Sequence, residues 1–131
     1  MKKKGSVSDF KDERDRELLE AFKSQLHLLG SIETGKLFIR ASEMPASRFW
    51  VSEQRAGVVI SKLERGDKLE RMNPKRREMF LEIYRRVRDI MEENPTIKRT
   101  EAIFRVVNSR APEFYLTPKS ARAMIYRLRA C

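Results

Sequence analysis

The chain has 131 residues, 37% charged and 40% hydrophobic, with a formal net charge of +10 at pH 7. This length allows one domain or two very small ones, and the charge favours a polyanionic partner: DNA, RNA or an acidic membrane surface. No apolar run approaches the ~20 residues that a membrane-spanning helix needs, and the single cysteine, Cys131, excludes an internal disulfide. We therefore expect a cytoplasmic protein without a membrane partner.

A repeat with an offset of 65 residues runs through the chain without a gap. Residues 46–56 are echoed by residues 111–121, and the same offset relates Phe22 to Val87 and Ile60 to Ile125. A fixed period over this length indicates two copies of one small unit. A unit of roughly 60 residues is only marginally stable alone because it buries a small share of its surface.

The first copy is predicted to form three helices after a basic arm, residues 1–8, that we expect to be disordered. Apolar residues at spacings of three and four predict a long helix over Phe10–Leu29. A shorter helix over Thr34–Ser42 ends before Pro45, because the residue preceding a proline avoids the helical region. An aromatic connector then leads to a third helix over Glu53–Arg65.

The second copy repeats this plan in the same order. Its predicted helices cover Pro74–Glu93, Arg99–Asn108 and Pro118–Ala130, with an aromatic connector before the last one. Ser52 and Thr117 occupy equivalent positions before the two third helices, where a side-chain oxygen can accept a hydrogen bond from a free amide. The agreement between the copies supports these helix starts.

The predicted fold class is all-α, with two tandem, internally duplicated three-helix units at residues 9–66 and 73–131 and a short linker at 67–72. This plan resembles the three-helix form of the helix-turn-helix class over nearly the whole chain. The resemblance implies that the third helix enters the major groove and that the second helix braces it. The connector departs from that class, because it is longer and lacks the usual glycine. The strings at 49–52 and 114–117 also resemble small, mostly uncharacterised proteins of bacterial mobile elements and prophages.

The last helix is the predicted nucleic-acid reader, since residues 66–131 carry a net charge of +7 against +3 for residues 1–65. Its outward side chains suit phosphates and base edges. The predicted contacts of this helix are Lys119, Ser120, Arg122, Ala123, Tyr126, Arg127 and Arg129. The less basic third helix of the first copy offers Gln54, Arg55 and Lys62.

Other charged and aromatic residues have more ordinary interpretations. Phe49 and Phe114 are predicted to be core, and the arginines at 85, 86 and 88 are expected to form a solvated helix face. Arg76 lies near a helix start and opposes the helix dipole. Two interpretations of this position stay open: Arg76 contacts a phosphate, or it has no particular role.

The leading functional prediction is a non-enzymatic protein that binds double-stranded DNA mainly through the last helix, as a small regulator or accessory factor of a bacterial or mobile-element system. The alternative is an oligomeric assembly or adaptor protein, similar to small terminase subunits, with the first unit as its interface to a partner or a second copy. RNA binding ranks lower. No catalytic site, metal or cofactor is predicted, because His27 has no histidine or internal cysteine to share a metal with.

Overall fold

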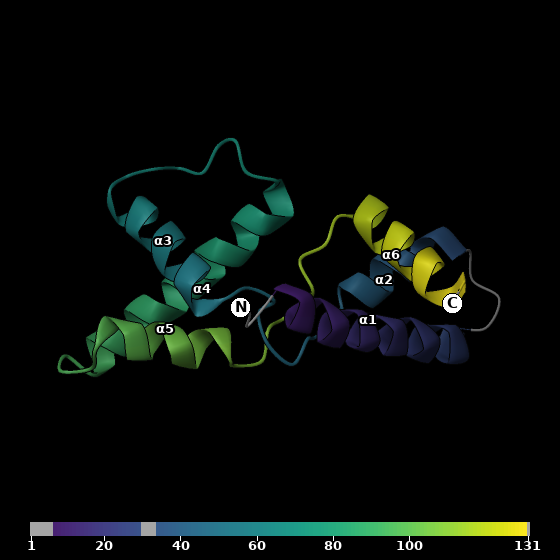
Figure 1. Cartoon of the computed structure of the whole chain (residues 1–131), viewed down its shortest axis with the longest axis horizontal. Coiled ribbons are helices and arrows are strands. Elements are labelled where there is room, and N and C mark those ends of the chain that lie inside the picture. The colour runs from purple at the N-terminus through teal and green to yellow at the C-terminus, as the bar shows by residue number, and fades with distance from the viewer. Residues whose placement is uncertain (1–6, 30–33, 131) are drawn as a thin grey trace. The chain divides into compact units, whose positions relative to one another are not determined.

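The computed structural model describes residues 7–29 and 34–130 of the chain (Figure 1). Over these ranges the chain forms six helices and no strand, which confirms the all-α prediction. The helices are α1 (Val7–Leu29), α2 (Thr34–Ser42), α3 (Glu53–Glu64), α4 (Pro74–Glu93), α5 (Arg99–Val107) and α6 (Pro118–Ala130). The predicted disordered arm lies outside the described residues except for positions 7 and 8, which already belong to α1.

Helices α3, α4 and α6 each begin after a residue whose side chain accepts a hydrogen bond from the first turn. The amide of Arg55 donates to the Ser52 hydroxyl oxygen at 3.0 Å, and the amide of Ser120 donates to the Thr117 hydroxyl oxygen at 3.1 Å. Asn73 accepts from the amide of Lys75 at 2.8 Å, ahead of a proline in the first turn of α4. The predicted caps of α3 and α6 are therefore confirmed.

Removing either third-helix cap is expected to cost stability without changing the fold. Ser52→Ala and Thr117→Ala should each lower the free energy of unfolding by about 1 kcal/mol, because one amide of the first turn loses its acceptor. Urea unfolding followed by circular dichroism measures this change. Thr96→Ala, at an exposed turn position before α5, is the matched control, and an equal loss there would show that the caps contribute nothing particular.

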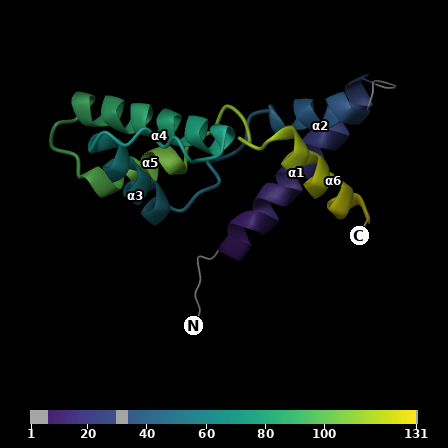
Figure 2. The ribbon, with the colours of Figure 1, turned by 90° about the horizontal axis from the view of Figure 1, so that it is seen from above.

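The helices assemble into two compact units, and each unit takes its third helix from the other copy. One unit comprises residues 1–46 and 111–131, so it holds α1, α2 and α6, and the second unit comprises residues 47–110, with α3, α4 and α5. Within each unit all three helices contact one another. Figure 2 shows each group of three from a second direction.

The predicted tandem arrangement is therefore not confirmed. Residues 9–66 and 73–131 do not coincide with the compact units. The second and third helices of each copy belong to different compact units, whereas the helix-turn-helix plan implies that they belong to one. The physical reason lies in the connectors, residues 43–52 and 108–117. Each connector is long enough to carry the chain out of one unit and into the other, at Ala46–Ser47 and at Arg110–Ala111.

The two connectors make equivalent hydrogen bonds, although each leads its third helix into the other compact unit. The amide of Phe49 donates to the carbonyl of Val107 at 3.1 Å, and the amide of Phe114 donates to the carbonyl of Ser42 at 2.9 Å. These bonds are equivalent, because 49 corresponds to 114 and 42 to 107 under the offset of 65. Ala46 and Ala111, which are also equivalent, form an isolated antiparallel bridge with bonds of 3.0 and 2.9 Å.

Each unit has its own apolar core built from helix stripes and one connector phenylalanine. Phe22 and Phe38 stack with ring centroids 5.3 Å apart in the first unit. Its buried side chains include Leu18, Phe22, Leu37, Phe38, Phe114, Ala121 and Ile125. Those of the second unit include Phe49, Ala56, Val59, Ile60, Phe80, Ile83, Val87, Ile103, Val106 and Val107. Phe49 and Phe114 are thus core, as predicted. Leu26, which lies on the same helix stripe as Leu18 and Phe22, is 39% exposed.

Candidate nucleic-acid interface

The predicted contact residues fall into two sets that belong to different compact units. The α6 set lies in the first unit, where all its members are exposed except Ser120, which is half-buried. Ser120 takes part in the helix cap, because its hydroxyl oxygen accepts a hydrogen bond from Thr117 at 2.9 Å. The α3 set lies in the second unit, with Gln54 and Arg55 exposed and Lys62 half-buried.

Helix α6 presents positive charge that few acidic groups neutralise. Its sequence from Pro118 to Ala130 contains four cationic residues and no Asp or Glu. Arg127 lies 3.4 Å from a carboxylate oxygen of the buried Asp15. The Arg122 guanidinium lies over the Tyr126 ring at 5.5 Å, and that of Arg129 lies over the Phe22 ring at 5.3 Å. Stacking of this kind holds a guanidinium in place without cancelling its charge.

On helix α4, by contrast, arginine side chains are paired with carboxylates of the same helix. Arg85 and Arg86 both donate to the Glu82 carboxylate, at 2.7 and 2.6 Å, and Arg85 also reaches Asp89 at 3.1 Å. Burial works to raise the pKa of Glu82, but the hydrogen bonds from the two arginines outweigh it and hold that pKa below its ordinary value. These arginines are therefore engaged in ion pairs along the helix and are poor candidates for a ligand contact.

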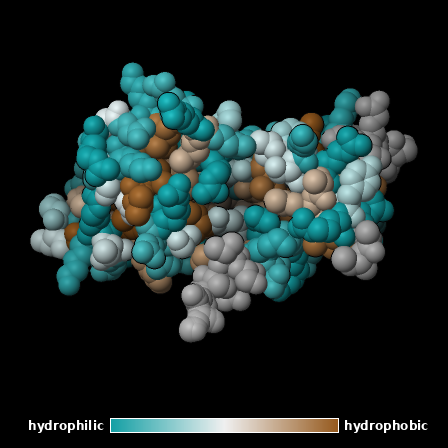
Figure 3. All heavy atoms as spheres, turned by 45° about the horizontal axis from the view of Figure 1, so that its top comes forward, coloured by the Kyte–Doolittle hydropathy of each residue, from teal (hydrophilic) through white to brown (hydrophobic). Residues whose placement is uncertain are grey.

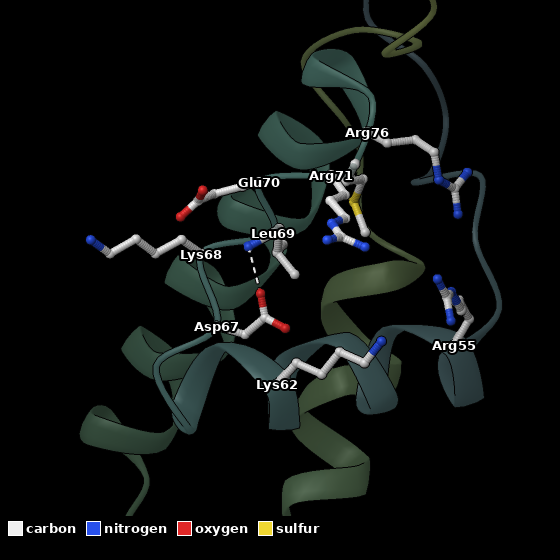
Figure 4. A pocket seen from close by; sticks show the side chains of 9 residues that line it. Arg55, Lys62, Asp67, Lys68, Leu69, Glu70, Arg71 and Arg76 are labelled. Carbon is white, nitrogen blue, oxygen red and sulfur yellow. Dashed lines mark hydrogen bonds between the residues drawn. The ribbon is translucent and has the colours of Figure 1, made fainter.

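A basic cleft opens in the second unit, along α3 and the loop that leads to α4. It has a volume of about 600 Å³ and is lined by Arg55, Lys62, Asp67, Lys68, Leu69, Glu70, Arg71, Met72 and Arg76. Figure 4 shows Arg55, Lys62, Arg71 and Arg76 pointing toward the cleft, whereas Lys68 and Glu70 point away from it. We call this site the basic cleft.

The four inward cations of the basic cleft have no carboxylate partner among the described residues. Burial, and then the nearby charge of Arg55, lower the pKa of Arg76 from its ordinary value. The Arg76 guanidinium also lies 5.3 Å from the centroid of the Phe80 ring. The cleft therefore holds positive charges that no carboxylate neutralises, and of its four inward cations Lys62 is half-buried while Arg55, Arg71 and Arg76 are exposed.

The loop of the basic cleft has a well-defined backbone. Leu69 is buried and adopts φ +55°, a left-handed conformation that a leucine rarely adopts. Its amide donates to the Asp67 carboxylate at 2.7 Å, and its carbonyl accepts from the amide of Met72 at 3.1 Å. Arg77 adds a side-chain bond to the carbonyl of Lys68 at 2.9 Å. These bonds hold the loop in the shape that forms one wall of the cleft.

Sequence reasoning found Arg55 and Lys62 but did not join them to Arg71 and Arg76. Arg71 lies in the predicted linker, residues 67–72, and the sequence indicates for Arg76 only that its charge opposes the helix dipole. That misfit was the available signal, since Arg55 and Arg76 each occupy the third position of a helix.

A second cleft, of about 500 Å³, lies between α3 and α5 and is largely apolar. It is lined by Glu53, Gln54, Gly57, Val58, Ser61, Arg99, Thr100 and Ile103. Val58 is 47% exposed, and Arg99 closes one side by donating to Glu64 at 2.6 Å. Figure 3 shows hydrophobic side chains gathered on one face of this unit, where most of the surrounding surface is hydrophilic.

No family model matches the chain, and no curated protein or solved structure is significantly similar to it. Within residues 7–29 and 34–130, no helix combines the length and apolar character that crossing a membrane requires. In the same ranges no group of three or more His, Cys, Asp or Glu side chains is placed to hold a metal ion. The resemblance to the helix-turn-helix class remains a prediction.

Proposed function

We propose that the chain is a non-enzymatic protein that binds double-stranded DNA through α6, as a small regulator or accessory factor. The observation that carries this proposal is the set of free cations on that helix. Lys119, Arg122 and Arg129 have no carboxylate partner among the described residues, in contrast to the paired arginines of α4. Contacts of Lys and Arg with phosphates supply most of the affinity of such proteins for DNA.

The outward face of α6 has a geometry suited to a phosphate backbone. Lys119, Arg122 and Tyr126 follow one another at spacings of three and four, so they lie along one stripe of the helix. Tyr126 is 50% exposed, and its ring rests on Phe38 with centroids 5.2 Å apart. Ala123 is exposed beside this stripe and leaves room for a close approach of a sugar-phosphate strand.

A salt series with duplex DNA tests this proposal. Binding should weaken steeply as salt rises, and Arg122→Gln should reduce the slope of log affinity against log salt by about one unit, because one phosphate contact is lost. Arg88→Gln on α4 is the matched control, since Arg88 is exposed and faces Glu92 at 3.8 Å. Tyr126→Phe removes only the hydroxyl and tests its bond to phosphate. Absence of binding at low salt, or equal effects of Arg122→Gln and Arg88→Gln, would contradict the role of α6.

The apolar cleft between α3 and α5 favours the second candidate, an assembly or adaptor protein. Val58 and Ile103 offer this cleft an apolar lining of the kind that protein interfaces use at their centres. Sedimentation with and without DNA distinguishes the two candidates, and a strict monomer under both conditions would count against assembly. Competition between duplex DNA and duplex RNA in the same assay addresses the remaining alternative of RNA binding.

A further inference from the structure

The basic cleft lies in the other compact unit from α6 and is not used by the proposed contact of that helix. Three guanidinium groups and one ammonium group point into the cleft. The Asp67 carboxylate also lines the cleft, and it accepts a hydrogen bond from the amide of Leu69. The unit that contains the cleft has 16 Lys and Arg against 10 Asp and Glu, a net charge of +6. Like charges that line one cleft repel one another, and a bound anion relieves that repulsion.

Two of the four cations sit where a helix disfavours positive charge. Arg55 is the third residue of α3 and Arg76 is the third residue of α4, so each lies at the positive end of a helix dipole. One such position is an ordinary local misfit. Two that line a single cleft, with the charge of one affecting the other, indicate a site that becomes favourable when an anion binds.

The chemistry of the lining selects phosphate among anions. Guanidinium groups present paired N–H donors whose spacing matches two oxygens of one phosphate group, and three guanidinium groups exceed what a single carboxylate can satisfy. The remaining inward surface comes from Leu69 and Met72, and no aromatic ring lines the cleft for a base to stack on. A volume of about 600 Å³ accommodates more than one phosphate group.

We propose that the basic cleft is a binding site for ligands with two or more adjacent phosphate groups. Arg55 and Arg76 hold the ligand from the first turns of α3 and α4, while Lys62 and Arg71 approach it from the helix and the loop. The hydrogen bonds of the loop fix the backbone around Arg71 in advance, which lowers the cost of ordering the site when the ligand binds. The site itself does not depend on DNA binding by α6, and only DNA as the source of the phosphates would rest on that proposed function.

Titration of the full chain with inorganic pyrophosphate tests the site directly. We expect calorimetry to detect binding, and arginine side-chain Nε–H signals in ¹⁵N correlation spectra to shift for Arg55, Arg71 and Arg76. The double change Arg55→Gln with Arg76→Gln should weaken pyrophosphate binding by at least about tenfold, because two charge-assisted contacts are lost.

The matched control is Arg85→Gln with Arg88→Gln, which removes the same charge from an exposed face of α4. Little change is expected there, and an equal loss in both double variants would overturn the proposal, as would a lack of pyrophosphate binding by the unaltered chain. Circular dichroism checks that each variant is folded. Arg71→Gln, in the exposed part of the loop, provides a second test if the helix-start variants unfold.

Two further ligands identify the source of the phosphates. If the change at Arg55 and Arg76 lowers the salt slope for duplex DNA by about two units, the nucleic-acid backbone fills the cleft. If it affects only pyrophosphate and a nucleoside triphosphate, the ligand is a small phosphorylated molecule, and the site still stands. Pyrophosphate binding without DNA binding would remove the proposed function of α6 and leave the cleft. DNA binding that Arg122→Gln weakens, with no binding of pyrophosphate, would remove the cleft and leave the proposed function.

Discussion

A fragment of residues 47–110 is expected to fold by itself, with a cooperative unfolding transition, whereas a fragment of residues 9–66 is expected to be largely unfolded. The first fragment contains α3, α4 and α5 with the whole buried core of the second unit. The fragment of residues 9–66 contains α1 and α2 but lacks α6, the helix that packs against both of them. Circular dichroism with urea titration compares the two directly.

Independent folding of the first unit can be tested in the same way, by joining its two segments, residues 1–46 and 111–131, directly. The backbones of Ala46 and Ala111 form a hydrogen-bonded antiparallel pair, which a two-residue Asn-Gly turn is suited to join. A chain that runs from residue 1 to Ala46, through Asn-Gly, and from Ala111 to residue 131 is expected to fold as α1, α2 and α6. Cooperative folding of 9–66, with failure of 47–110, would instead indicate that each third helix packs within its own copy.

Truncating the buried isoleucine of each third helix should destabilise the unit in which that helix packs. Ile60 and Ile125 are equivalent in the repeat, and both side chains are fully buried. Ile60→Ala is expected to lower the free energy of unfolding of the 47–110 fragment by about 2–5 kcal/mol, since the side chain leaves a cavity. That loss is comparable with the whole stability of a small unit.

Hydrogen exchange in the full chain shows where each change is felt. Ile60→Ala should increase amide exchange in α4 and α5, and Ile125→Ala should increase it in α1 and α2. The two changes are controls for each other, because they remove the same atoms from equivalent positions. Increased exchange in α1 and α2 after Ile60→Ala, with α4 and α5 unaffected, would contradict the exchange of third helices.

Local chemistry made the helices predictable from the sequence. The bounds of α2, α4 and α6 agree with the prediction, while α3 and α5 end one residue early and α1 starts at Val7 instead of Phe10. Prolines, hydroxyl caps and apolar spacing act within a few residues, so they can be interpreted without knowledge of the fold.

The pairing of helices could not be predicted from the same patterns. The apolar stripe of Ala56, Ile60 and Leu63 is equivalent to that of Ala121, Ile125 and Leu128. Either third helix therefore presents a similar apolar face to the first two helices of either copy. What decides the pairing is the path of the connectors and their bonds, such as that from Phe49 to Val107. Those contacts are distant in sequence and leave no periodic signal.

One of the two candidate sites could be predicted from the sequence, and the other could not. The basic face of α6 follows from helical spacing and was predicted. The basic cleft depends on a loop that brings Arg71 and Arg76 beside Arg55 and Lys62, three segments that no spacing rule relates. The net charges of the two sequence halves favour the second copy as the nucleic-acid contact. The compact units divide the charge differently, because the unit that contains α3 and the basic cleft carries +6 of the total of +10.

The exchanged third helices impose an order on folding during synthesis. The segment of residues 47–110 is continuous, so it can form its core as soon as α5 has left the ribosome. Helices α1 and α2 emerge earlier but must wait for α6, which is made after every other described helix. The first helices to be translated are thus among the last to be buried, and during that interval their apolar faces are open to chaperones or to a neighbouring nascent chain.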